Sequence, residues 1–267
     1  MDSLTSWLLF AAVGGVAGVL AGLLGVGGGL VIVPALTFVF IPQHLPSEHI
    51  MHLALGTSLA TIIFTSVSSV RAHHGRGAVR WVIVRRITLG ILVGTFAGSW
   101  VAAQLSTGFL KGFFAIFLYY VAAQLLLDIK PKPSRQMPGL AGTTGMGGVI
   151  GVVSALVGIG GGSLSVPFML WCNVPAREAI GTSAAIGFPI AISGALGFMV
   201  NGLSASGLPA HTLGYIYLPA LAGVALVSVL TAPLGAKLAH TLPVPTVKKI
   251  FALLLLGMAT KMVWGLF

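Results

Sequence analysis

The chain has 267 residues, of which 57% are hydrophobic and 7% charged, and its mean hydropathy is +1.04. Soluble domains carry about 25% charged residues, so this composition excludes a soluble globular protein and predicts an all-α, polytopic membrane protein. The formal charge of +10 lies mainly in connections between apolar segments, where it serves membrane topology, so we expect no nucleic-acid partner.

Apolar helical segments are predicted along the whole chain, five in each half. In the first half they cover residues 4–24, 30–41, 50–70, 79–105 and 109–127. In the second half they cover residues 140–157, 163–171, 176–200, 213–240 and 247–266. The second segment of each half is too short to cross an apolar core of about 30 Å. It is therefore expected to be a Gly-rich broken or re-entrant helix, either paired with its predecessor as a hairpin or crossing as a strongly tilted segment.

Two motifs occur once in each half, in the same order. A glycine-rich run followed by Val-Pro occupies residues 25–34 and recurs at 158–167. A run ending in Gly-Thr-Ser occupies residues 54–58 and recurs at 179–183. The spacing between the two motifs is shorter in the second half, which indicates an insertion in the polar stretch 42–48 of the first half.

A third match closes each half, because Leu110-Lys111 corresponds to Val247-Lys248. Three ordered matches predict an internal duplication. We expect one membrane transport domain, 1–267, built from repeats 1–128 and 139–267 that are joined by the basic linker 129–138.

Basic residues cluster in the connection after the third segment and between the two halves. The positive-inside rule places these connections, including the linker 129–138, in the cytoplasm, and only Lys111 and Lys261 then lie outside. The second-half counterpart of the first basic connection, residues 201–207, carries no charge and falls outside. We therefore expect two inverted repeats, each with an odd number of crossings.

Inverted repeats with interrupted helices are typical of transporters, which expose one midplane site alternately to the two sides. Each glycine break allows a ligand to approach the backbone closely, and the short helix after it presents unpaired N–H groups and the positive end of its dipole, which favour an anion. The Gly-Thr-Ser runs add neutral hydroxyl donors. The candidate substrate-binding residues are Gly27, Gly28, Gly29, Thr57, Ser58, Gly160, Gly161, Gly162, Thr182 and Ser183. The alternative is that these glycines only permit tight helix crossing and that the hydroxyls bond to their own helices.

Other glycines recur every four residues on one helical face, a pattern of close helix packing in lipid. They are Gly14, Gly18 and Gly22, and Gly90, Gly94 and Gly98. Small-residue faces would also suit a homodimer, and membrane lipid is the other partner that the composition implies.

The remaining chemistry-bearing residues indicate neither a metal, a cofactor nor an enzyme. Cys172 is the lone cysteine and is expected to pack, while His49 and His52 are interpreted as solvated loop residues although their spacing would let them share a helix face. The chain has neither Gly-x-Ser-x-Gly nor His-Glu-x-x-His, so we expect no enzyme activity.

The four acidic residues are Asp2, Glu48, Asp128 and Glu178, all near segment ends, which leaves no obvious carboxylate deep in the membrane for proton or sodium coupling. An anion that leaves a cell with a negative interior gains about 2.3 kcal/mol per charge per 100 mV. Export therefore needs no coupled ion, whereas accumulative import would need a coupling group, for which Glu178 is the candidate.

The two glycine-rich runs, residues 24–34 and 157–167, and both Gly-Thr-Ser triplets resemble the TauE/SafE sulfite exporter family. The resemblance covers essentially the whole chain. It implies a multi-pass permease of the cell inner membrane for sulfite, an organosulfonate or a related sulfur-containing organic anion. We therefore expect export of such an anion by alternating access, with the anion held at the glycine breaks. A passive anion channel and a non-transporting membrane assembly subunit are the alternatives.

Overall fold

The computed structural model describes residues 3–24, 28–127, 134–238 and 244–266. Its first half contains α1 (Ser3–Leu24), α2 (Gly29–Phe40), α3 (Ile50–His74), α4 (Trp81–Gln104) and α5 (Thr107–Leu126). Its second half contains α6 (Leu140–Val157), α7 (Gly162–Trp171), α8 (Ala176–Gly202), the strands β1 (Thr212–Leu213) and β2 (Ile216–Tyr217), α9 (Leu218–Leu238) and α10 (Val244–Trp264). Seven of these helices are long and apolar enough to span a membrane, which confirms the expected all-α, polytopic fold.

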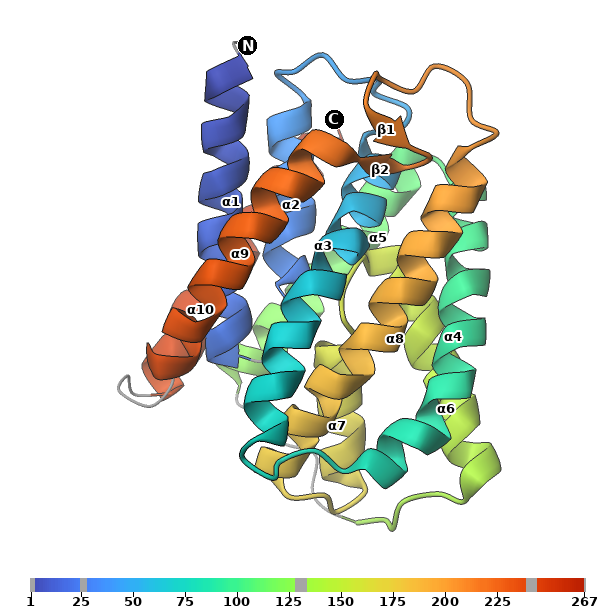
Figure 1. The fold of residues 1–267 in the computed structure, drawn as a ribbon, viewed down its shortest axis with the longest axis vertical. Helices are drawn as coiled ribbons and strands as arrows, with labels where there is room; N and C mark the ends of the chain where they lie inside the picture. The colour runs from blue at the N-terminus through green and yellow to red at the C-terminus, as the bar shows by residue number, and fades with distance from the viewer. Residues whose placement is uncertain (1–2, 25–27, 128–133, 239–243, 267) are drawn as a thin grey trace.

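The short helices α2 and α7 form hairpins with the helices before them. In the first half, α1 begins and α2 ends on the same side of the molecule, at the top of Figure 1. In the second half, α6 begins and α7 ends on the opposite side, at the bottom of Figure 1. The two hairpins enter from opposite sides, so the halves are inverted, and the hairpin is the correct one of the two arrangements that the sequence left open.

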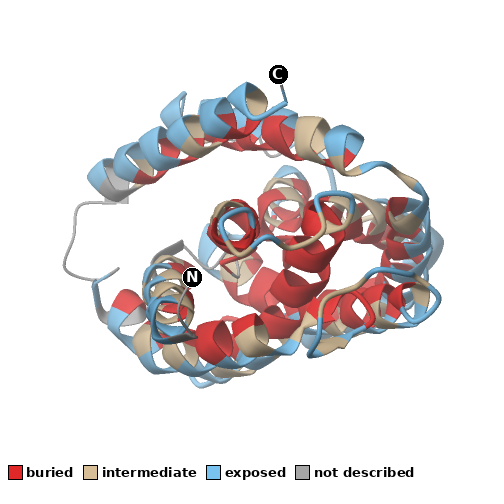
Figure 2. Ribbon diagram, turned by 90° about the horizontal axis from the view of Figure 1, so that it is seen from above, coloured by how far each residue is buried: buried red, intermediate tan, exposed pale blue. Residues whose placement is uncertain are grey.

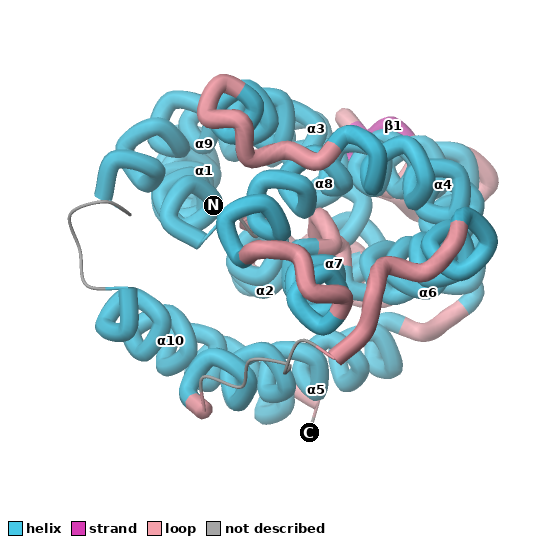
Figure 3. Tube along the Cα trace, turned by 90° about the horizontal axis from the view of Figure 1, so that it is seen from below, coloured by secondary structure: helices cyan, strands magenta, loops and turns pink. Residues whose placement is uncertain are grey.

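Each hairpin packs against a helix of the other half. Helix α1 lies along α9 and α6 lies along α4, while α3 and α8 pack against each other at the centre. Helices α5 and α10 pack together along one side of the molecule, as Figure 3 shows from below. These pairings are symmetric: α1 and α6 are equivalent in the two halves, as are α9 and α4, so the contact of α1 with α9 corresponds to that of α6 with α4.

Glycines bring the backbones of α4 and α6 into direct contact. A Cβ atom on Gly90 would lie 1.8 Å from Thr144 O, and one on Gly94 would lie 2.2 Å from Gly148 O. On the other side of the molecule, a Cβ on Gly14 would lie 2.6 Å from Val224 O of α9. These glycine faces therefore serve packing within the chain, as the sequence pattern predicts for helices in lipid.

The core lies at the centre of the bundle, and the outward faces are apolar. Figure 2 shows buried residues gathered in the interior of the bundle and exposed residues on its outward faces, and α3 and α8 contribute many of the buried ones. The exposed residues of α4 include Leu89, Val93 and Trp100, each more than half exposed. A surface of this kind suits contact with lipid, because hydrocarbon solvates apolar side chains as well as a protein core does.

The expected helix over residues 213–240 is wrong at its start. Strands β1 and β2 form a short antiparallel hairpin in which Thr212 pairs with Tyr217 and Leu213 with Ile216, so α9 begins only at Leu218. His211 and Gly214 have positive φ angles of 62° and 56°, which turn the chain and prevent a helix there. The last residues of the expected helix, 239 and 240, lie outside the described part of the chain.

The two ends of the molecule differ in charge. The connections at the bottom of Figure 1 follow α3, precede α6 and join α7 to α8. They and the adjoining helix ends carry Arg71, Arg76, Arg80, Arg85, Arg86, Arg135 and Arg177. We call this the arginine-bearing end; the opposite end carries β1, β2 and residues 41–49 between α2 and α3.

Candidate functional site

The break before α2 packs directly against the break between α6 and α7. A Cβ atom on Gly29 would lie 2.6 Å from Gly158 O and 2.9 Å from Ile159 Cα, so only glycine allows this approach. From α3, the Ser58 hydroxyl donates a hydrogen bond of 2.8 Å to Gly158 O. The structure thus brings Gly29 and Ser58 of the first half together with the glycine break of the second.

Glycines also make the turns that start both short helices. Gly28 has a φ of 77° before α2, and Gly161 has a φ of 75° before α7. These left-handed conformations are accessible to glycine without the steric cost that a Cβ atom imposes. Each carbonyl then accepts the first bonds of its helix, from Val31 and Ile32 at Gly28 O and from Leu164 and Ser165 at Gly161 O.

The N-terminus of α7 is buried, and its donors lack hydrogen-bond partners within the described part of the chain. Gly162 and Ser163 are both buried, and their backbone N–H groups have no acceptor among the residues that the structure describes. The Ser163 side chain, 7% exposed, also lacks a partner for its hydroxyl. A buried helix end without capping groups is unusual, because each unpaired donor costs about 1–3 kcal/mol.

A second unpartnered hydroxyl lies beside this helix end. Ser154 of α6 is fully buried, and its Oγ lies 3.4 Å from the position that a Cβ atom on Gly161 would take. The break therefore gathers two backbone N–H groups, two free hydroxyls and the positive end of the α7 dipole. Neutral donors beside a helix N-terminus are groups that can bind an anion.

The Gly-Thr pair of the first half docks the start of α9. A Cβ atom on Gly56 would lie 2.4 Å from Tyr215 O, so glycine lets this segment approach α3. The Thr57 hydroxyl oxygen then accepts a hydrogen bond of 2.9 Å from the backbone N–H of Tyr217, the residue before α9.

The Gly-Thr pair of the second half has the same role at the start of α4. A Cβ atom on Gly181 would lie 2.4 Å from Ala78 O, and the Thr182 hydroxyl oxygen accepts a 2.9 Å hydrogen bond from the backbone N–H of Arg80, the residue before α4. Both threonines thus join the two halves at equivalent places. Each hydroxyl still has its own proton to donate.

The serines that end the two triplets differ in their bonds. Whereas Ser58 donates to a backbone carbonyl, Ser183 accepts a 2.8 Å hydrogen bond from the hydroxyl of Ser165, which joins α7 to α8. Those of the remaining predicted residues that the structure describes also lie at the breaks. Gly160 and Gly162 flank the turn at Gly161, and Gly27 lies outside the described residues.

The serines at the second break are residues that the sequence analysis missed. Ser154, Ser163 and Ser165 occupy positions where the first repeat has Ala21, Leu30 and Ile32. The predicted site residues are those that the two copies share, so residues that differ between the copies were not among them. The available signal was three serines in one copy opposite apolar residues in the other.

The interpretation of His52 as a solvated loop residue is wrong. His52 lies in α3, is 4% exposed, and stacks on the ring of Tyr215 with the ring centroids 4.9 Å apart. Its Nε2 lies 3.1 Å from Ala102 O. Burial and the nearby Glu48 carboxylate raise the pKa of Tyr215 above the ordinary tyrosine value. Within the described part of the chain, no group of three or more His, Cys, Asp or Glu residues could hold a metal ion.

The chain is similar to a known protein family and to several membrane proteins. A family model described as "Sulfite exporter TauE/SafE" matches residues 10–262. A "Probable membrane transporter protein" of Haemophilus influenzae is 39% identical over 257 residues, which cover 96% of this chain and 97% of the relative. "Probable membrane transporter protein YunE" of Bacillus subtilis is 30% identical, covering 74% and 80%, and "Probable membrane transporter protein MJ0441" of Methanocaldococcus jannaschii is 31% identical, covering 78% and 75%. No solved structure matches the chain.

Proposed function

Since the chain belongs to the TauE/SafE sulfite exporter family, we propose that this membrane transporter exports a small oxyanion, sulfite or an organosulfonate, by alternating access. The family and the relatives' names are those of transporters, which confirms the expectation that the chain is a multi-pass membrane transporter and not an enzyme. The substrate, its site and the direction of transport are the proposal.

The observation that carries the proposal is the buried, unpartnered N-terminus of α7. The amides of Gly162 and Ser163 and the hydroxyls of Ser154 and Ser163 are donors without acceptors among the described residues. A sulfite or sulfonate group has three oxygens, which can accept all of these bonds at once. Bonds to an ionised acceptor are roughly twice as strong as neutral ones, so the bound anion offsets part of its lost hydration.

The surroundings favour an anion over a cation. Of the two acidic residues in the described part of the chain, Glu48 lies at the end that carries β1 and β2, and Glu178 lies at the arginine-bearing end, where it pairs with Arg80. The break itself therefore offers neutral donors without a carboxylate. A cation there would need anionic ligands or exposed carbonyls.

The packing of the two breaks supports alternating access. The hairpins enter from opposite sides and meet where Gly29 contacts Gly158, so a small rotation of one half against the other opens the site toward one side and closes it toward the other. The hydrogen bond from Ser58 to Gly158 O crosses this contact. It links α3 of one half to the break of the other.

The positive-inside rule supports a cytoplasmic position for the arginine-bearing end. Because the cell interior is negative, the membrane potential favours export of an anion by about 2.3 kcal/mol per charge per 100 mV, without a coupled ion. Glu178 is engaged with Arg80 outside the break, which argues against a role for its carboxylate in coupling.

Flux in proteoliposomes tests the proposal, with sulfite, sulfate, thiosulfate, sulfoacetate, taurine and chloride offered under an imposed membrane potential. We expect saturable, potential-driven movement of a sulfur oxyanion. Ser163→Ala removes one hydrogen bond to the charged substrate, worth about 1.5–3 kcal/mol, so the KM should rise about ten- to a hundredfold.

The matched control is Ser228→Ala in α9. Ser228 is also fully buried, but its hydroxyl donates to Ala225 O within its own helix, so its loss should leave the KM unchanged. Flux that does not saturate would favour the passive channel. If folded protein transported none of these anions and copurified with a fixed partner, the result would favour the assembly subunit.

A further inference from the structure

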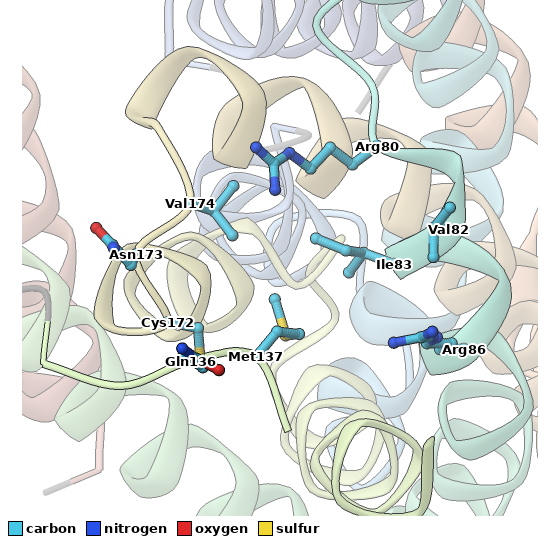
Figure 4. Close-up of a pocket in the computed structure, with 9 residues that line it drawn as sticks. All are labelled: Arg80, Val82, Ile83, Arg86, Gln136, Met137, Cys172, Asn173 and Val174. Atoms are coloured by element: carbon cyan, nitrogen blue, oxygen red, sulfur yellow. The ribbon is translucent and has the colours of Figure 1, made fainter. Parts of the chain in front are cut away.

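A second pocket lies at the arginine-bearing end, outside the site at the breaks. It has a volume of about 460 Å³ and is lined by the first turns of α4, residues 136–137 before α6, and residues 172–174 between α7 and α8. Figure 4 shows these three segments around it. Since α7 has ten residues and rises 1.5 Å per residue, the pocket lies about 15 Å along this helix from Gly162.

Two guanidinium groups give the pocket its charge. Arg80, the residue before α4, and Arg86 of α4 line the pocket in Figure 4. Arg80 pairs with Glu178, the first-turn carboxylate of α8, whereas the Arg86 side chain has no partner among the described residues. Glu178 is also the only acidic side chain described at this end, so the lining has a net positive charge.

The backbone does not oppose an anion here. Helix α4 begins at the pocket, so the positive end of its dipole points there. Helix α7 ends at the pocket, but the amides of Cys172, Asn173 and Val174 already bond to its last carbonyls, on Phe168, Leu170 and Met169. The negative end of α7 is thereby capped.

The rest of the lining is partly apolar and partly amide. Ile83, Met137 and Val174 supply an apolar wall and Gln136 supplies a side-chain amide, while Asn173 also lines the pocket with its amide pointing away from the other lining residues in Figure 4. This combination suits a small organic molecule with one oxyanion group and a short apolar part. The volume is that of about fifteen water molecules at roughly 30 Å³ each, which suits a small molecule.

We propose that this pocket is a second anion-binding site, which takes a small soluble organic oxyanion from the solvent at the arginine-bearing end. Arg86 is its main ligand, and Arg80 is shared between the anion and Glu178. The site does not depend on which anion crosses the membrane. It does connect to the transport core, because the backbone N–H of Arg80 is bonded to Thr182 of α8.

Cys172 offers a direct measure of occupancy, because it lines the pocket and is the only cysteine in the chain. The assay follows the rate at which N-ethylmaleimide labels Cys172 in the purified full-length protein, in detergent without phospholipid, as methanesulfonate replaces chloride at constant ionic strength. We expect a saturable, several-fold slowing of labelling. The melting temperature, followed through the same titration, should rise in parallel and gives the readout if labelling is too slow to follow.

Three variants locate the effect. Arg86→Gln should raise the half-protecting concentration of methanesulfonate about tenfold. Arg85→Gln is the matched control, since Arg85 is exposed and belongs to α4 as Arg86 does but does not line the pocket; it should behave as wild type. Glu178→Gln releases Arg80 to the anion and should lower the half-protecting concentration. Equal protection in Arg86→Gln and wild type, or no protection and no rise in melting temperature, would overturn the proposal.

Two further arms separate this site from its rivals. Ser163→Ala, which weakens the proposed site at α7, should leave protection of Cys172 intact, so the two proposals fail independently. In nanodiscs without methanesulfonate, phosphatidylglycerol and phosphatidylcholine should give equal labelling rates. Protection by phosphatidylglycerol alone, with none by methanesulfonate, would make the pocket a lipid headgroup site and would refute a soluble ligand.

Discussion

Gly29→Ala tests the contact between the two glycine breaks. The added Cβ atom would lie 2.6 Å from Gly158 O and 2.9 Å from Ile159 Cα, against about 3.4 Å for an ordinary contact, so one break must move by about 0.8 Å. Both neighbouring atoms belong to the backbone, which cannot rotate away as a side chain can. The substitution should therefore push the two hairpins apart.

The expected cost follows from two opposing effects. Overpacking costs about 1–3 kcal/mol, whereas alanine in place of glycine inside a helix recovers at most about 1 kcal/mol. From the middle of the overpacking range, about 2 kcal/mol, a recovery of up to about 1 kcal/mol leaves a net destabilisation of about 1–2 kcal/mol, which corresponds to a fall of about 2–8 °C in Tm for a chain of this size. Because the displaced atoms belong to the break that carries the proposed site, transport should fall more than tenfold.

Thermal unfolding of the purified protein and flux in proteoliposomes measure these two effects. The matched control is Gly145→Ala in α6, where a Cβ atom meets nothing within 4 Å, so Tm should stay constant or rise. If Gly29→Ala melted and transported as the wild type does, the two breaks would not pack together as described, and the argument for their shared role in gating would fail.

Two further predictions rest on single side chains. Thr57→Val and Thr182→Val each remove the hydrogen-bond acceptor of a part-buried backbone N–H before α9 or α4, so each should cost about 0.5–1.5 kcal/mol in thermal unfolding, and similar losses in the two variants would reflect their equivalent bonds. Burial raises the pKa of the Cys172 thiol, and the Arg135 charge opposes this shift. The rate of maleimide labelling should therefore rise with pH, with a midpoint above the ordinary thiol pKa, and Arg135→Gln should move that midpoint higher. A midpoint at or below the ordinary thiol pKa would contradict the burial of Cys172.

Helix positions were largely predictable because each break in the apolar pattern has a local cause. The start of α6 at Leu140 and its end at Val157 agree with the prediction, since Gly139 and Gly158 flank the apolar run. The start of α9 was not predictable in this way. Leu213, Ile216 and Tyr217 continue an apolar run, but the strand pairing and the bond from the Tyr217 amide to Thr57 hold this segment out of the helix.

The contacts of the Gly-Thr-Ser triplets could not be read from the sequence, because their partners are far along the chain. Thr57 bonds to a residue 160 positions away, and Thr182 to one 102 positions away. From the sequence, these hydroxyls are expected either to bind a ligand or to bond within their own helix. The structure adds a third role, in which each threonine docks the start of a helix from the other half.

Positions that the two copies of the motif share pack the halves together, whereas positions where the copies differ supply hydrogen-bond donors. Positions that the copies share, such as Gly56 and Gly181, make equivalent contacts between the halves, as an exchange between two inverted states requires. Positions where they differ give the second break its donors, because Ser163 stands where the first copy has Leu30. This difference between the two helix starts favours a stoichiometry of one anion per chain, held at the second break. Two equal sites would be expected to carry serines at both helix starts, and Leu30 gives the start of α2 an apolar side chain in place of a hydroxyl donor.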